Sequence, residues 1–267
     1  MKISFIGAGN MATAIIKSIT LSGRVPANEI FVFDKFEDKA NELVKLGVNK
    51  CCGISEAVSS ADTVLLAVKP QDYETLLLSI KDCGVALHNK TFISIAAAIS
   101  CNYITSTLGC DCPVVRVMPN TPLMLGIGAT AISRNSLVTD KSYSKICTLF
   151  ASSGVVCSLD EDMMNKVISV NSSSPVYLYM LAQAMINKAV EYGISDKNAR
   201  DLVFQTMKGS VEMLIKSGST PDDLIKMVAS PGGTTLAAIS SMTDDGFNET
   251  IYKAMDACTE RANQLSK

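Results

Sequence analysis

The chain has 267 residues, which at roughly 150 residues per domain allows two domains or one large one, and enough material to bury a core. Hydrophobic residues make up 48% and charged residues 19%, so some apolar surface is expected to lie in an interface between chains. The net charge of -2 and the lack of a long basic run argue against nucleic acid or an anionic membrane surface as a partner, and favour small-molecule chemistry.

The first half of the chain alternates short apolar runs with segments of helical periodicity. The runs of strand length are residues 2–6, 29–33, 63–68, 91–96 and 113–118. In residues 10–23 and 37–47, apolar side chains recur on one helical face and each segment ends at a glycine. This alternation predicts a doubly wound parallel sheet.

The pattern changes after about residue 160, where strand-like runs almost vanish. Long helical segments are predicted for residues 175–193 and 196–218, and for a final stretch from 246 towards 267. We therefore expect an N-terminal domain of nucleotide-binding type over residues 1–160. A helical domain over residues 161–267 is expected to supply the contacts between chains.

A glycine motif follows the first predicted strand and opens the first predicted helix. Residues 7–12 read Gly-Ala-Gly-Asn-Met-Ala and match G-x-G-x-x-G/A with alanine in the third place. Gly7 can make the tight turn, Gly9 leaves room for a pyrophosphate, and Ala12 lets helix and strand pack closely. The turn predicts a dinucleotide site for NADH or NADPH, and the alternative is a structural turn. The expected contacts are Gly7, Ala8, Gly9, Asn10 and Met11.

The end of the second predicted strand is expected to meet the adenosine ribose of that cofactor. It carries Asp34 followed by Lys35. An acid there bonds the ribose 2'-hydroxyl of NAD, whereas a cation can hold the 2'-phosphate of NADP, so both residues are candidate cofactor contacts and the choice stays open. Alternatively, Asp34 is the N-cap of the next helix and Lys35 is only solvated.

Later strand ends supply further candidates, because ligands of open parallel sheets bind outside the carboxyl ends of the strands. Cofactor contact is expected at Val68, Lys69, Pro70, Ala96, Ala97 and Asn120. The structural alternatives are a proline in the first turn of a helix and tight packing of small residues. Arg116 lies within an apolar strand and needs a partner, for which a structural ion pair is the alternative to a functional role.

The spacing of the nine cysteines fits neither a disulfide framework nor a zinc site, and no metal site is expected. The only histidine, His88, is expected in a loop, and with one histidine a Ser-His-Asp hydrolase or a metal site of several histidines is excluded. No apolar run reaches the ~18 residues of a membrane span, and the start lacks the features of a signal peptide. A cytoplasmic protein with reduced cysteines is the expectation.

A set of motifs resembles the pyrroline-5-carboxylate reductases, which make proline by reducing a cyclic imine with NAD(P)H. The motifs FIGAGNMA, AVKP, VRVMPNTP, SSSPVY and VASPGGTT occur in the order and approximate spacing of that family, over residues 1 to about 265. The resemblance implies an α/β protein with an N-terminal Rossmann-type sheet and an all-α C-terminal domain that interlocks two chains. Such dimers often assemble into larger rings. It also implies that the substrate is held by Ser230, Gly233, Thr234 and Thr235.

The chain departs from the family where Asn171 and Ser172 replace a usual serine and glycine, and where Val176 replaces a usual alanine. These positions precede or open a long helix, for which Ser174 as N-cap and Pro175 at the first helical position are a structural explanation. The departures put fine substrate preference in doubt more than the reaction.

The chemistry of the segment around Pro231 agrees with this assignment. Glycines let backbone N–H groups converge, and the start of a helix near Thr235 favours a carboxylate. Thr235 is the predicted catalytic residue, because its hydroxyl can reach the ring nitrogen, and Ser230 could reach the carboxylate. The structural alternative is a turn at Pro231–Gly233 with Thr234 or Thr235 as an N-cap.

Other functions compatible with the pattern are a 3-hydroxyacid dehydrogenase and a non-catalytic dinucleotide-binding regulator. The former would place a catalytic lysine on the long helix after the sheet, whereas Lys166 lies before that helix and residues 175–183 contain none. The altered pair Asn171 and Ser172 is the only support for a regulator.

Overall fold

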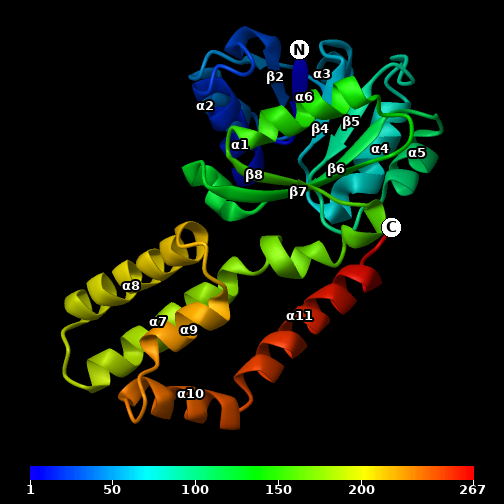
Figure 1. The fold of residues 1–267 in the computed structure, drawn as a ribbon. Coiled ribbons are helices and arrows are strands. Elements are labelled where there is room, and N and C mark those ends of the chain that lie inside the picture. The colour runs from blue at the N-terminus through cyan, green and yellow to red at the C-terminus, as the bar shows by residue number, and fades with distance from the viewer. The chain divides into compact units, whose positions relative to one another are not determined.

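The computed structural model describes all 267 residues, and the chain forms two compact units. The first comprises Met1–Ser174 and Cys258–Lys267, and the second comprises Pro175–Ala257 (Figure 1). The first unit thus continues beyond residue 160, because Met164 and Ile168 join a buried cluster with Met118 and Ala131 of the sheet. The functional division into residues 1–160 and 161–267 stays a prediction.

The first unit is built on one eight-stranded sheet with the order β3-β2-β1-β4-β5-β6-β7-β8. The strands are β1 (Ile3–Ile6), β2 (Ile30–Phe33), β3 (Asn49–Lys50), β4 (Thr63–Leu66), β5 (Thr91–Ser94), β6 (Val114–Met118), β7 (Gly128–Arg134) and β8 (Gly154–Ser158). All neighbours pair in parallel except β6 and β7, which are antiparallel. The predicted parallel sheet and its strands β1, β2, β4, β5 and β6 are confirmed, whereas β3, β7 and β8 lie outside the predicted set.

Helices cover both faces of this sheet (Figure 1). They are α1 (Asn10–Leu21), α2 (Glu37–Val44), α3 (Ile54–Ser59), α4 (Tyr73–Lys81), α5 (Cys101–Leu108) and α6 (Asp140–Ala151). Side chains alternate across a strand, so β1 sends Phe5 into a core shared with α1 and Ile6 into a second core shared with α4. The carboxyl ends of β1, β4 and β5 are therefore held from both faces.

The second unit consists of helices alone. They are α7 (Pro175–Glu191), α8 (Asp196–Lys216), α9 (Pro221–Val228), α10 (Thr234–Asp244) and the first part of α11 (Phe247–Gln264), whose end belongs to the first unit. The long helices predicted from periodicity are confirmed, and Pro175 opens α7 as expected. The Ser174 hydroxyl donates to the Val170 carbonyl at 2.6 Å. No helix of the chain combines the length and the apolar character needed to cross a bilayer.

Most apolar side chains of the second unit lie on its surface. Its buried cluster is confined to Ala182, Ile186, Ala199 and Val203, where α7 packs on α8. In contrast, Tyr179, Met180, Leu202, Ile215 and Met227 are all more than half exposed. Helices with so much exposed apolar surface are typical of an interface between chains.

Candidate active site

The glycine turn joins β1 to α1, as the sequence predicts. Gly7 has φ +107°, and a Cβ built on it would lie 2.5 Å from the Ala67 carbonyl oxygen, so only glycine fits there. Gly9 is the N-cap of α1, and a Cβ built on it would meet nothing within 4 Å. No side chain caps the helix, so the amides of Asn10 and Met11 have no partner of that kind and can bind an anion.

Asp34 ties the end of β2 to this turn. Its Oδ2 accepts a hydrogen bond from the Ala8 N–H at 2.7 Å, and its Oδ1 accepts one from the Phe36 N–H at 2.8 Å. The N-cap of α2 is Phe36, so the alternative in which Asp34 caps that helix is wrong. Lys35 is 67% exposed and lies 3.8 Å from the Asp72 carboxylate. An exposed pair at that distance binds weakly, which leaves the ammonium available to a ligand.

One pocket brings the predicted cofactor residues of three strand ends together. The candidates that line it are Gly7, Gly9, Asp34, Lys35, Val68 and Lys69. Phe36, Lys39, Gln71 and Asp72 also face this pocket and lie outside the predicted set. Pro70 opens the 3-10 turn Pro70–Asp72 that leads into α4, so the structural reason given for it holds as well.

The loop after β5 is the next predicted contact. Ala96 is buried, Ala97 is half-buried, and Ala98 has φ +64°, the one positive φ outside glycine in the chain. Holding alanine in this left-handed region costs on the order of 1 kcal/mol. The Ala96 N–H donates a hydrogen bond to the Ser94 Oγ at 3.4 Å. The Ser94 Oγ also forms a hydrogen bond with the Tyr73 hydroxyl at 2.8 Å. The loop is thus fixed to the interior of the sheet.

Burial governs the titration of the groups beneath the strand ends. Removal from water raises the pKa of the Tyr73 hydroxyl well above its usual range. The same cause raises the pKa of the Cys51 thiol to about 11. These groups therefore stay neutral in the folded chain at physiological pH and act as packing and hydrogen-bonding groups.

All nine cysteines are free thiols, and His88 lies in an exposed turn as predicted.

The side-chain amide of Asn120 forms hydrogen bonds to backbone groups through both its oxygen and its nitrogen. Its Oδ1 accepts from the Ala129 N–H at 2.9 Å, and its Nδ2 donates to the Asn171 carbonyl at 3.2 Å. The Asn171 amide nitrogen donates in turn to the carbonyls of Met118 and Ala129, at 2.8 and 2.9 Å. These bonds join β6, β7 and the π-helical turn Ile168–Ser172. A contact between Asn120 and the cofactor stays a prediction.

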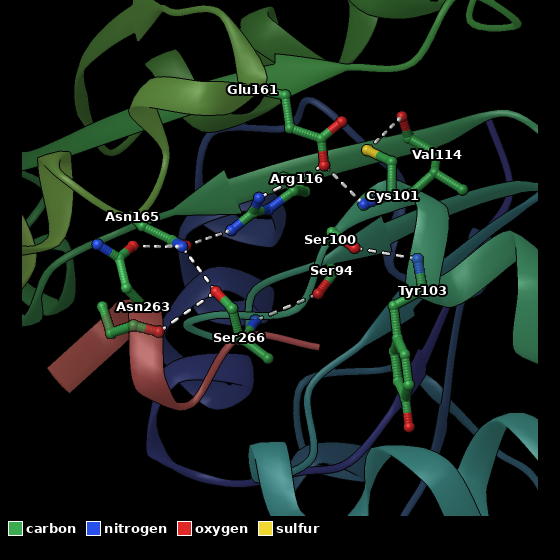
Figure 2. Close-up of polar contacts among 12 residues, drawn as sticks. Ser94, Ser100, Cys101, Tyr103, Val114, Arg116, Glu161, Asn165, Asn263 and Ser266 are labelled. Carbon is green, nitrogen blue, oxygen red and sulfur yellow. Dashed lines mark hydrogen bonds and ion pairs between the residues drawn. The ribbon is translucent and has the colours of Figure 1, made fainter. Parts of the chain in front are cut away.

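Arg116 belongs to a structural cluster, and the ion-pair alternative is confirmed. It is 4% exposed, with Nη1 at 3.4 Å from Glu161 and Nη2 at 3.2 Å from the Asn165 Oδ1. Glu161 also accepts a hydrogen bond from the Cys101 N–H at 2.7 Å, at the start of α5. Figure 2 shows these side chains converging on the end of α11 through Asn263 and Ser266. The sequence interval between Arg116 and Glu161 gives no signal for this pair.

The predicted substrate segment is a tight turn between α9 and α10. Gly232 has φ +69°, and the Gly233 N–H donates to the Ser230 carbonyl at 3.0 Å. A Cβ on Gly233 would lie 2.5 Å from the Ser230 Oγ, so this side chain rests against the turn. Gly233 is the N-cap of α10, without a side-chain cap, so the alternative in which Thr234 or Thr235 caps the helix is wrong. Both hydroxyls and the first-turn amides are therefore open to a ligand.

Two family descriptions match the chain. "Pyrroline-5-carboxylate reductase dimerisation" matches residues 161–265, and "NADP oxidoreductase coenzyme F420-dependent" matches residues 2–98. Among curated proteins, pyrroline-5-carboxylate reductase of Escherichia coli (strain K12) is 34% identical over 268 residues, which cover 100% of this chain and 98% of that protein. The Arabidopsis thaliana protein of the same name is 32% identical over 267 residues, covering 100% and 96%.

Solved structures agree with these similarities. A pyrroline-5-carboxylate reductase from Coxiella burnetii superimposes with a TM-score of 0.91 at 30% identity, covering 100% of this chain and 98% of that one. Plasmodium falciparum pyrroline carboxylate reductase with NADP bound gives a TM-score of 0.89 at 27% identity, with coverage of 100% and 98%.

Proposed function

Because the chain belongs to the pyrroline-5-carboxylate reductase family, we propose that it reduces 1-pyrroline-5-carboxylate to L-proline, with the hydride supplied by NADH or NADPH. It is an NAD(P)H-dependent oxidoreductase that acts on a C=N bond, in the last step of proline biosynthesis. The observation that supports the assignment most directly is the start of α10, which offers amides and hydroxyls without a side-chain cap.

The residues at the first glycine turn fit a dinucleotide. The space beside Gly9 and the uncapped start of α1 suit a pyrophosphate, which would be held by the amides of Asn10 and Met11. Asp34 and Lys35 would hold the adenosine ribose at the end of β2. The strand order places β4 and β5 on the other side of β1 from β2, so Val68, Lys69, Ala96 and Ala97 are assigned to the nicotinamide half, with Pro70 beside them.

The second glycine turn is assigned to the carboxylate of the imine. A helix N-terminus favours an anion, because its amides carry no internal partner and the helix dipole adds partial positive charge. The amides of Thr234 and Thr235 would bind the carboxylate, and the exposed Ser230 hydroxyl would add a third donor. A Cβ at position 233 would clash with the Ser230 Oγ, so glycine there leaves this hydroxyl in place.

Thr235 is assigned to the ring nitrogen. Its side chain is half-buried, and Gly233 rather than either threonine caps the helix. A hydroxyl at this place can hydrogen-bond the nitrogen, orient the C=N bond and hold a proton there while the adjacent carbon is reduced. A protonated imine is already an electrophile, so positioning is the main task of the protein.

Self-association follows from the match to the dimerisation family. The exposed apolar side chains of α7 and α8 support a dimer through the helical unit, and we extend the proposal to a ring of dimers. The net charge of -2 gives no support for a nucleic-acid partner. The free thiols support a reducing compartment, so the cytoplasm is the proposed location.

The assay that tests the function follows NADH and NADPH oxidation with 1-pyrroline-5-carboxylate and, in parallel, with aldehydes derived from 3-hydroxyacids. We expect turnover only with the imine. The reverse reaction, proline-dependent reduction of NAD+ or NADP+ at high pH, is expected as well. Binding of NADH or NADPH without turnover of any of these substrates would instead support a regulator.

A further inference from the structure

The loop after β5 is paired with residues near the end of α11, far away in the sequence. The Lys267 N–H donates to the Ala98 carbonyl at 3.0 Å, and the Ser100 N–H donates to the Lys267 carbonyl at 3.0 Å. Lys267 thus lies beside the loop as a neighbouring strand would. Its ammonium adds only exposed contacts, 3.5 Å from Glu74 and 5.6 Å from the centre of the Tyr103 ring.

The polar cluster around Arg116 holds both partners of this pairing. On the loop side, Glu161 accepts from the Cys101 N–H directly after Ser100. On the other side, the Asn165 Nδ2 donates to the Ser266 Oγ at 2.7 Å (Figure 2). Arg116 contacts both Glu161 and Asn165, so one buried guanidinium joins the two attachments.

The loop needs this support because of its backbone. Ala98 has φ +64°, a conformation that alanine adopts only when the surrounding structure imposes it. The hydrogen bond from Lys267 acts on the carbonyl of that same residue. Without it, Ala98 can return to an ordinary conformation, which would move Ala96 and Ala97 at the carboxyl end of β5.

We propose that residues 265–267, anchored by Asn165, position Ala96 and Ala97 for the nicotinamide half of the cofactor. These residues act on the cofactor site through Ala98, so they are positioning residues. The inference rests on the proposed function at one point, the assignment of the loop to the nicotinamide half. The adenosine half is assigned to Asp34, which follows β2 on the other side of β1 and bonds Ala8 and Phe36.

The test compares the two dinucleotides with a ligand that lacks the nicotinamide. Calorimetric titration without imine gives the Kd of NADPH, of NADH and of ADP-ribose, which lacks nicotinamide. Deleting residues 265–267 removes both backbone hydrogen bonds to the loop and should raise the Kd of whichever dinucleotide binds by about tenfold. Asn165→Ala keeps the three residues but removes their anchor at Ser266, together with one hydrogen bond to Arg116, and should raise the Kd by about threefold. The Kd of ADP-ribose should stay within about twofold in both variants.

Gln264→Ala is the matched control, because its side chain bonds only Glu260 and Arg261 of its own helix. Equal weakening of both ligands would show a general structural role and overturn the proposal, as would unchanged binding of both. Asn165→Ala keeps the test valid if the deletion does not fold. The binding titrations contain no imine. A wild-type chain that binds NADPH in them but does not reduce the imine in the activity assay would therefore overturn only the proposed function.

Discussion

Gly7 lies directly over the end of β4, where a Cβ on it would stand 2.5 Å from the carbonyl oxygen of Ala67. Gly9, two residues later in the same motif, faces open space. The two glycines therefore have different roles. Gly7 is required by the fold, and Gly9 leaves room that the chain itself does not fill.

Alanine at each position should separate these roles. Gly7→Ala forces a clash and a φ of +107°, so we expect it to lower the free energy of unfolding by about 2–3 kcal/mol. Gly9→Ala should lower it by less than about 1 kcal/mol and raise the Kd of the dinucleotide at least about tenfold. Urea denaturation and calorimetric titration measure the two effects. A Gly9→Ala variant with wild-type affinity would show that the pyrophosphate lies elsewhere.

Removal of the Thr235 hydroxyl should impair the reaction and spare the cofactor. We expect Thr235→Ala to lower kcat/KM for the imine by on the order of tenfold or more, because one hydrogen bond at the reacting atoms is lost. The Kd of NADPH or NADH should change by less than about twofold. Thr235→Ser keeps the hydroxyl and should recover most of the activity. Unchanged imine reduction by Thr235→Ala would remove this residue from the mechanism.

The sequence predicted the strands whose apolar runs are bounded by turns, and the glycine motif that follows the first of them. It did not predict β7, because Gly128–Arg134 mixes small, polar and apolar residues and returns antiparallel to β6. Nor did it predict β8, an edge strand with Val155 and Cys157 exposed. A strand at an edge carries little of the hydrophobic pattern on which such predictions depend.

In the candidate site, too, only features that a local motif marks could be predicted from the sequence. Asp34 and Lys35 were found because a motif fixes their distance from the glycine turn. The hydrogen bonds of Asn120 were not, because its partner Asn171 lies 51 residues away. The pairing of Lys267 with Ala98 depends likewise on the fold, since nothing in the local sequence marks residues that meet across it.

The buried thiols should make the folded chain less stable as the pH rises into the alkaline range. Burial raises the pKa of the Cys51 thiol to about 11 and that of the Cys112 thiol to about 12, from 9.0. Between pH 9 and 11 the unfolded chain therefore loses protons that the folded chain keeps. The contribution is complete below pH 9 and disappears as pH rises through about 11 for Cys51 and about 12 for Cys112.

Urea unfolding between pH 8 and 11 measures this dependence, and Cys51→Ala is the comparison because it removes one of the buried thiols. We expect the free energy of unfolding to fall more steeply with pH in the wild type than in Cys51→Ala. Identical slopes would mean that the Cys51 thiol titrates as it does in the unfolded chain. The result also sets the upper pH at which proline oxidation can be assayed.

The exposed apolar face of the helical unit should control self-association. Met180 and Ile215 are 68% and 69% exposed in the single chain. If they are covered by a second copy, Met180→Asp with Ile215→Asp would bury unpaired charge and weaken the dimer by on the order of a hundredfold. Sedimentation velocity measures this. Leu21, the last residue of α1, is 87% exposed, and Leu21→Asp is the control that should keep the wild-type mass. A double variant that stays dimeric would place the interface elsewhere.

Asn171 should prove to be a stabilising residue. Its amide donates to two carbonyls, of Met118 and Ala129, whereas serine has one hydrogen and could serve only one of them. Its own Oδ1 is buried without a partner, so Asn171→Ser also removes a cost. We expect a net loss of about 1 kcal/mol in the free energy of unfolding by urea, with kcat/KM within about twofold. Asn171→Asp, which aims a negative charge at both carbonyls, should be less stable still. A stable Asn171→Ser variant with an altered KM for the imine would instead assign this position to substrate preference.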